Sequence, residues 1–205
     1  MSFCYLKFAF FLVAMLMLVS IGAKAVGSIQ PPNPALHGFV EGCEGQPQPC
    51  WYGIVPGVTD LLLGEHTIIQ QGYKRIEADS ESATGFTGDQ NNDFNKIILW
   101  HSGNVVDAVS LLYPTRMKLG DAIDVLGKPT GVISFFDAEN IIGLTYPDET
   151  FRMAIVGSNA SLDEQAITGF LLATPSFNSS SVITRWHGFV PKWRYCQLEP
   201  DFGYC

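Results

Sequence analysis

Hydrophobic and polar positions follow three different patterns along this chain. Residues 8–23 (FAFFLVAMLMLVSIGA) are apolar almost without interruption. Residues 60–71 and 118–126 carry apolar residues at the spacing of a helix face. Short runs rich in β-branched and aromatic residues follow each of these two segments, bounded by Gly, Asn, Asp or Pro, which is typical of strands. The patterns predict an apolar N-terminal segment followed by two units, each a helix and then strands.

The first helix is expected over residues 60–71. Thr59 is suited to the N-cap position, and Gly72 is suited to the position just beyond the helix. Gly64 weakens the segment, because glycine is a poor helix former. Three apolar side chains fall near one face of this helix, Leu62, Leu63 and Ile69, with Leu61 as a further candidate for that face.

The second helix is expected over residues 118–126 and has the clearer pattern. Leu119, Ile123 and Leu126 share one face, at positions i, i+4 and i+7. Gly127 ends the helix, and Pro129 prevents its continuation.

Strands are expected after both helices. Those of the first unit are residues 73–78, 95–100 and 105–112, and those of the second are residues 132–136, 141–146, 151–156 and 166–173, with a late edge strand at 182–186. The connections at 137–140 and 147–149 are too short for parallel crossovers, so the strands should form antiparallel meanders.

These elements predict an α+β fold in which two helix-plus-antiparallel-sheet modules pack together. The first module is expected at residues 38–115 and the second, with an aromatic C-terminal segment, at 116–205. Residues 26–37 are rich in Pro and short polar residues and are interpreted as a linker. One continuous sheet is the alternative to two packed modules.

The first 25 residues are interpreted as a targeting segment. Lys7 precedes the apolar run, and Ala23-Lys24-Ala25 follows it with the small-x-small pattern of a cleavage site. The alternatives are an uncleaved N-terminal membrane anchor and a buried core helix. The protein is therefore expected to be secreted or extracytoplasmic, with membrane contact only through this segment.

The cysteines agree with export. Apart from Cys4, the chain holds four: Cys43, Cys50, Cys196 and Cys205. An even number in an exported chain predicts disulfides, with three possible connectivities. Turn residues between the partners favour local pairing, which would staple both ends; cross pairing and a four-cysteine zinc site are the alternatives.

Charge excludes some partners. The full chain has a net charge of −8, and all 20 acidic residues lie after residue 25. Lys74-Arg75 is the longest basic run, whereas nucleic acid requires a row of positive charge. Nucleic acid is therefore not expected as a partner.

Part of the second module resembles a known family. Residues 119–129 (LGDAIDVLGKP), followed by strands and Tyr146, are similar to the small lipoprotein of the bacterial outer-membrane assembly machine, with Leu126, Gly127, Pro129 and Tyr146 matching. That resemblance implies a helix, an antiparallel meander and a non-catalytic scaffold or interaction module. The mature chain lacks the family's N-terminal lipid-bearing cysteine. Residues 45–59 also resemble a segment of uncharacterised exported bacterial proteins.

Aromatic residues gather at two places and suggest a binding surface. Trp51 and Tyr52 lie beside Cys50, and the C-terminal segment adds four further residues: Trp186, His187, Trp193 and Tyr195. Such rings can stack on sugars or anchor peptides. The alternative is that they cover the open end of the sheet as part of the core.

Candidate chemistry is sparse. Residues 89–95 (DQNNDFN) place oxygen ligands at alternate positions as calcium loops do, but a polar turn explains the same residues. His101 with Ser102 or Asp107 is the one hydrolase candidate, without a nucleophile motif. No nucleotide loop and no metal-binding histidine spacing occurs in the sequence.

The sequence therefore favours a non-catalytic extracytoplasmic binding or scaffold domain without cofactor, metal or catalytic residues. Its partner would be a protein, peptide or glycan. An exported hydrolase with a His/carboxylate site is the alternative.

Overall fold

The computed structural model describes residues 2–27, 33–76, 80–89, 91–114, 117–134, 141–146, 151–156, 167–174, 183–188, 194 and 197–198. The chain forms two compact units, Met1–Pro32 and Asn33–Cys205. The first unit contains α1 (Ser2–Gly27). Its large apolar side chains are exposed on all sides, so the helix has no packed face of its own. Over the described residues, no helix has the length and apolar character needed to cross a membrane.

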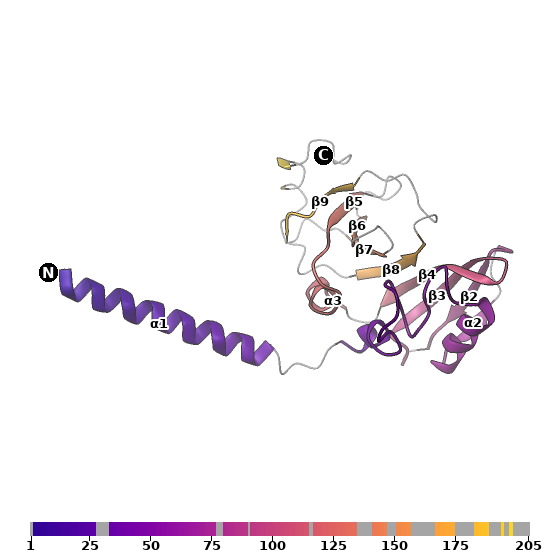
Figure 1. Ribbon diagram of the computed structural model, residues 1–205, viewed down its shortest axis with the longest axis horizontal. Helices are drawn as coiled ribbons and strands as arrows, with labels where there is room; N and C mark the ends of the chain where they lie inside the picture. Colours follow the sequence, from indigo (N-terminus) through magenta and orange to yellow (C-terminus); the bar gives the residue numbers. More distant parts are fainter. Residues whose placement is uncertain are drawn as a thin grey trace. The chain divides into compact units, whose positions relative to one another are not determined.

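The second unit is built from two modules of the same plan. The first has α2 (Leu61–Gln70) followed by four strands: β1 (Lys74–Ile76), β2 (Ala83–Thr87), β3 (Phe94–Ser102) and β4 (Val105–Pro114). The second has α3 (Leu119–Leu126) followed by β5 (Gly131–Ser134), β6 (Ile141–Thr145), β7 (Phe151–Val156), β8 (Ile167–Ala173) and then β9 (Ile183–Arg185). Figure 1 shows both helices beside their strands. The α+β fold of two helix-plus-antiparallel-sheet modules is confirmed.

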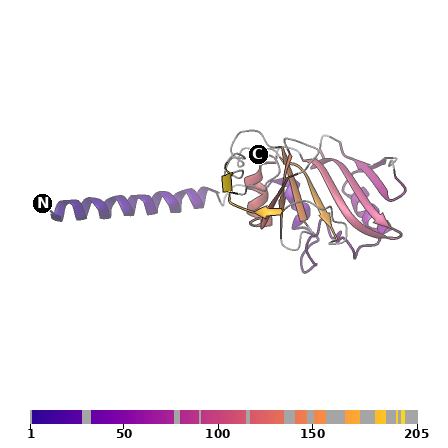
Figure 2. The same ribbon diagram turned by 90° about the horizontal axis from the view of Figure 1, so that it is seen from above.

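The two modules join edge to edge. The strand order is β1-β2-β3-β4-β8-β7-β6-β5-β9, with antiparallel pairing throughout. The last strands of the two meanders, β4 and β8, pair over five positions centred on Ser110 and Leu171. Figure 2 shows the long strands of the first module side by side. The modules therefore share one continuous sheet, which was the alternative to two separately packed ones, and the expected edge strand is β9.

The helix ends follow local chemistry. Asp60, rather than Thr59, is the N-cap of α2, and its carboxylate accepts the backbone N–H of Leu62 at 2.9 Å. Gly72 follows α2 with a φ of +86°, and Gly127 caps α3 with a φ of +82°. Both values lie in the left-handed region that glycine tolerates best.

Two elements were not expected. Pro34–Phe39 is a 3₁₀ helix, labelled η1, with Ala35 and Leu36 buried. The interpretation of residues 26–37 as a linker is therefore wrong for its last part. Strand β2 was also missed, because its sequence ATGFT combines small and polar residues around Gly85. A Cβ at Gly85 would lie only 3.0 Å from the side chain of Ile76 on β1. Because Gly85 has no side chain, Ile76 can pack closely over β2 at this position.

The face of helix α2 that packs on the sheet is not the one expected from the sequence. It buries Gly64, Glu65 and Ile68, whereas the apolar face read from the sequence is exposed. The exposed fractions are 74% for Leu62, 58% for Leu63 and 50% for Ile69. The approach is close at Gly64, where a Cβ would lie 3.3 Å from Val106 Cγ2.

One hydrophobic core extends through both modules. It contains buried residues of η1, α2, α3 and most strands. Phe94 of β3 and Phe170 of β8 meet at its centre with their ring centroids 6.0 Å apart, and Phe39 of η1 packs on Phe170 at 5.1 Å. The modules are therefore joined by side-chain packing as well as by strand pairing.

The segment before α2 is held by one disulfide. Cys43 and Cys50 are bonded, and both are buried with Val55. Local pairing is confirmed for these two cysteines. Cys196 and Cys205 lie outside the described residues.

Candidate functional site

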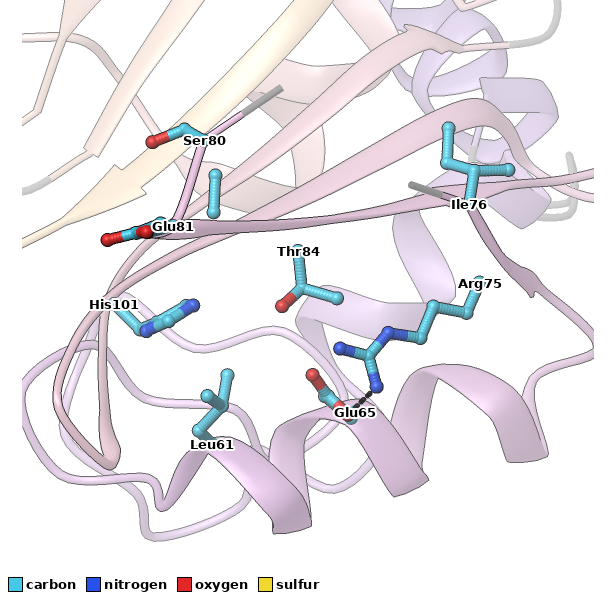
Figure 3. A pocket seen from close by; sticks show the side chains of 9 residues that line it. Leu61, Glu65, Arg75, Ile76, Ser80, Glu81, Thr84 and His101 are labelled. Atoms are coloured by element: carbon cyan, nitrogen blue, oxygen red, sulfur yellow. Dashed lines mark hydrogen bonds and ion pairs between the residues drawn. The ribbon is translucent and has the colours of Figure 1, made fainter. Parts of the chain in front are cut away.

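A pocket of about 580 Å³ lies between α2 and the end of the sheet formed by β1, β2 and β3 (Figure 3). Its volume is within the range of small-molecule sites, roughly 300 to 1,000 Å³. Six of its lining residues are polar or charged: Glu65, Arg75, Ser80, Glu81, Thr84 and His101. Three are apolar: Leu61, Ile76 and Ala83.

Helix and strand periodicity bring these side chains together. Leu61 and Glu65 are four residues apart on α2 and therefore share a face. On the sheet, Thr84 pairs with Leu99, which contacts α2 near Gly64. His101 lies two residues beyond Leu99 on β3, so strand alternation directs its ring to the same side. Figure 3 shows Glu65 on the helix side of the pocket, and Thr84 between Arg75 and His101.

An ion pair spans the pocket from helix to sheet. Arg75 Nη1 on β1 donates a hydrogen bond to Glu65 Oε2 at 3.2 Å. The Glu65 side chain is 11% exposed and the Arg75 side chain 62% exposed. The other carboxylate oxygen, Oε1, accepts no hydrogen bond from any residue that the structure describes. Glu65 therefore keeps acceptor capacity within the pocket.

Hydrogen bonds of the backbone and of two serine side chains fix the opposite end of the pocket. The N–H of His101 donates to the carbonyl of Ser82 at 2.9 Å, which ties β3 to the turn before β2. The hydroxyls of Ser80 and Ser82 bond each other at 2.9 Å. Glu81 between them is exposed, so its carboxylate adds negative charge at the rim.

The predicted hydrolase residues are not assembled. His101 lines the pocket, but neither Ser102 nor Asp107, both described, is among its lining residues. Ser102 follows His101 directly on β3, so its side chain points to the opposite side of the sheet.

The structure describes four of the six residues of the predicted aromatic surface. Trp51 and Trp186 are 1% and 7% exposed, so they belong to the core and cannot offer an indole face to a ligand. Trp51 packs edge-on against Tyr52 at 4.9 Å. Tyr52 and His187 are half-buried, and Trp193 and Tyr195 lie outside the described residues.

Within the acidic segment 89–95, residues 91–93 form a turn held by side chains of the segment, and Phe94 and Asn95 already belong to β3. Asp89 Oδ1 accepts the N–H of Asn91 at 2.8 Å, and Asn92 Oδ1 accepts the N–H of Asp89 at 2.7 Å. These bonds occupy one side-chain oxygen of Asp89 and the side-chain oxygen of Asn92, as expected for a polar turn. Within the described residues, no group of three His, Cys, Asp or Glu side chains is placed to hold a metal.

A second set of titratable groups lies near this turn. Burial raises the pKa of the Asp93 carboxyl, and His37 of η1 opposes that rise. Burial raises the pKa of the Tyr52 phenol, with smaller contributions from Asp93 and Glu41. Burial also raises the pKa of Tyr73 to about 12. Tyr52 and Tyr73 pack on Trp51, so this set belongs to the core edge and not to the pocket.

Glu65, Arg75, Glu81 and Thr84 were not singled out in the sequence. One feature pointed to Glu65, since it shares a helix face with Leu61 and Ile68. No family model, no curated protein and no solved structure matches this chain.

Proposed function

We propose that this protein is a non-catalytic extracytoplasmic binding domain whose ligand occupies the pocket between α2 and β1–β3. The observation that carries the proposal is the arrangement of Glu65, Arg75, Thr84 and His101 around about 580 Å³ of space. A few convergent polar groups beside apolar residues are typical of ligand sites. A protein, peptide or glycan could each present a group of suitable size.

Export is proposed from the N-terminal unit. Helix α1 contains the apolar run of residues 8–23, with Lys7 directly before the run and the Ala23-Lys24-Ala25 pattern at its end. The Cys43–Cys50 disulfide supports an oxidising compartment. We expect N-terminal sequencing of the secreted protein to begin near residue 26. A chain that starts at Met1 and stays in the reduced cytoplasm would contradict export.

A binding role is favoured over catalysis by how the polar groups are engaged. Glu65 is paired with Arg75, and the Ser80 hydroxyl is bonded to Ser82. A nucleophilic hydroxyl needs a base within hydrogen-bond reach, itself oriented by a third group. The described pocket residues do not include such a triad.

Binding can be tested on the ¹⁵N-labelled full-length protein in a neutral detergent. A panel containing an amine, a carboxylate, a neutral sugar and a short peptide is titrated while backbone amide shifts are recorded. We expect at least one compound to cause saturable shifts confined to α2 and β1–β3. Shifts absent for every compound, or centred on another region, would contradict the pocket as the binding site.

An exported hydrolase is the second candidate, because the pocket brings His101 together with two carboxylates, Glu65 and Glu81. This reading predicts turnover of ester or glycoside substrates that is lost in His101→Ala. Absence of turnover across both substrate classes, with ligand binding retained, would support the binding domain.

A further inference from the structure

We infer that the pocket recognises a protonated amine or guanidinium group, with Glu65 as the residue that receives it. This inference rests on the proposed binding function and adds the chemistry of the ligand. It is carried by the geometry and charge of the pocket.

The first step is the state of the Glu65 carboxylate. The residue is 8% exposed, and Oε2 alone is bonded, to Arg75. A nearly buried carboxylate is stabilised most by several charge-assisted hydrogen bonds, which are shorter and stronger than neutral ones. A cationic donor that enters the pocket would bond Oε1, so that both carboxylate oxygens of Glu65 would accept a charge-assisted hydrogen bond.

The second step is the balance of charge. Among the described residues that line the pocket are two carboxylates, Glu65 and Glu81, and one guanidinium, Arg75. These three groups together carry one excess negative charge. The chain as a whole is also acidic, with a net charge of −8. The negative charge of the pocket lining and the negative charge of the whole chain both favour a cationic ligand over an anionic one.

The third step concerns Arg75. Its guanidinium is already directed at Glu65 and is largely open to solvent (Figure 3). An anion bound to Arg75 would compete with Glu65 and leave a buried carboxylate unpaired, which is costly. A cation can instead share Glu65 with Arg75, one partner on each oxygen.

The fourth step is the shape of the remaining lining. Leu61 supplies apolar surface beside Glu65, and Thr84 supplies a hydroxyl on the sheet side. This combination suits an alkyl stem that ends in an ammonium group. Such a group occurs in free small amines and on lysine side chains of peptides.

Three compounds of equal length separate charge from shape: butylammonium, 1-butanol and butyrate. Each is titrated into the ¹⁵N-labelled full-length protein in neutral detergent. We expect saturable amide shifts at Glu65, Thr84 and His101 with butylammonium, and at least about tenfold weaker binding of the other two, as loss of one charge-assisted hydrogen bond implies. The peptide Gly-Lys-Gly and its side-chain-acetylated form distinguish a lysine source from a free amine.

Variants test the assigned residue. Glu65→Gln should weaken butylammonium binding about tenfold or more, whereas the same change at the exposed Glu44, in the disulfide loop, should leave it unchanged. If Glu65→Gln does not fold, Glu81→Gln is the second variant and should weaken binding about two- to threefold, as expected for an exposed charge.

The outcomes separate the two proposals. Binding of butyrate or 1-butanol at the same amides, without butylammonium binding, overturns the cation assignment and leaves the binding function standing. Equal affinities in Glu65→Gln and the unchanged protein also overturn the assignment. No shift with any of these compounds or the wider panel overturns both.

Discussion

Phe94 of β3 and Phe170 of β8 pack edge to face, with their ring centroids 6.0 Å apart and their planes at 85°. Both rings are buried, and they belong to different modules. Because β4 and β8 also pair directly, the two modules share both a sheet and a core. They should therefore unfold together.

Phe170→Ala tests this shared core. Removing a buried phenylalanine should lower the free energy of unfolding by about 3 to 5 kcal/mol. Tyr113→Ala, an exposed aromatic on β4, is the matched control and should cost less than about 1 kcal/mol. Urea unfolding followed by fluorescence and circular dichroism measures both. Two separate transitions for the two modules would contradict a single cooperative core.

The inverted packing of α2 makes a second prediction. Ile68→Ala should lower the free energy of unfolding by about 2 to 5 kcal/mol, because Ile68 is fully buried. Leu62→Ala should change it by less than about 0.5 kcal/mol, because Leu62 is exposed. The amphipathic pattern read from the sequence predicts the opposite order for these two positions. Chemical denaturation of the two variants decides which face packs on the sheet.

Tyr73 predicts a loss of stability at alkaline pH. Burial raises the pKa of its phenol to about 12 in the folded chain, against an ordinary value of 10.0. The unfolded chain therefore releases this proton more readily, and the free energy of unfolding falls as pH rises from about 10 to 12. Stability measured in steps from pH 8 to 12, with phenolate absorbance followed in parallel, checks this window.

The matched variant for that measurement is Tyr73→Phe. It should show a smaller alkaline loss, because the titrating group is gone. At neutral pH it should be less stable by about 1 to 3 kcal/mol, since the N–H of Phe94 donates to the Tyr73 hydroxyl at 3.2 Å and would lose its acceptor. An unchanged pH profile in Tyr73→Phe would rule Tyr73 out as the cause.

The Cys43–Cys50 disulfide closes a short loop. In the chain-entropy model, a loop of this length stabilises the folded state by about 2.5 kcal/mol. The double variant Cys43→Ala/Cys50→Ala should lose roughly that amount, measured by urea unfolding without reductant. Both sulfurs are buried, so we expect the intact protein to resist mild reductant. Free thiols at both positions in the native protein would contradict the bond.

Much of the fold followed from local sequence patterns. The ends of α3, the strands of both meanders other than β2, and the edge position of β9 depend on caps, turn residues and β-branched runs, which are readable one segment at a time. The face of α2 was not readable, because Gly64 gains its role only from Val106 and Leu99, which lie far along the chain. Tertiary packing therefore overrode the leucine pattern.

The candidate site was less predictable than the fold. His101 stood out in the sequence, but its neighbours in space did not. The pocket forms where α2 crosses β1, β2 and β3, so Glu65, Arg75 and His101 meet only once the meander has folded. The sequence suggested Trp51 and Trp186 as part of a binding surface, yet both side chains are buried in the core. Residue type alone does not distinguish an aromatic ring buried in the core from one exposed for ligand binding.

The central claim, that the pocket takes a cation at Glu65, is tested most directly by the affinity of butylammonium for Arg75→Gln. Removing Arg75 frees Glu65 Oε2 and removes the competing positive charge. Calorimetry on the full-length protein should therefore show tighter butylammonium binding than in the unchanged protein, by about threefold or more. Weaker butylammonium binding in Arg75→Gln, or binding that does not depend on Arg75, would contradict the account.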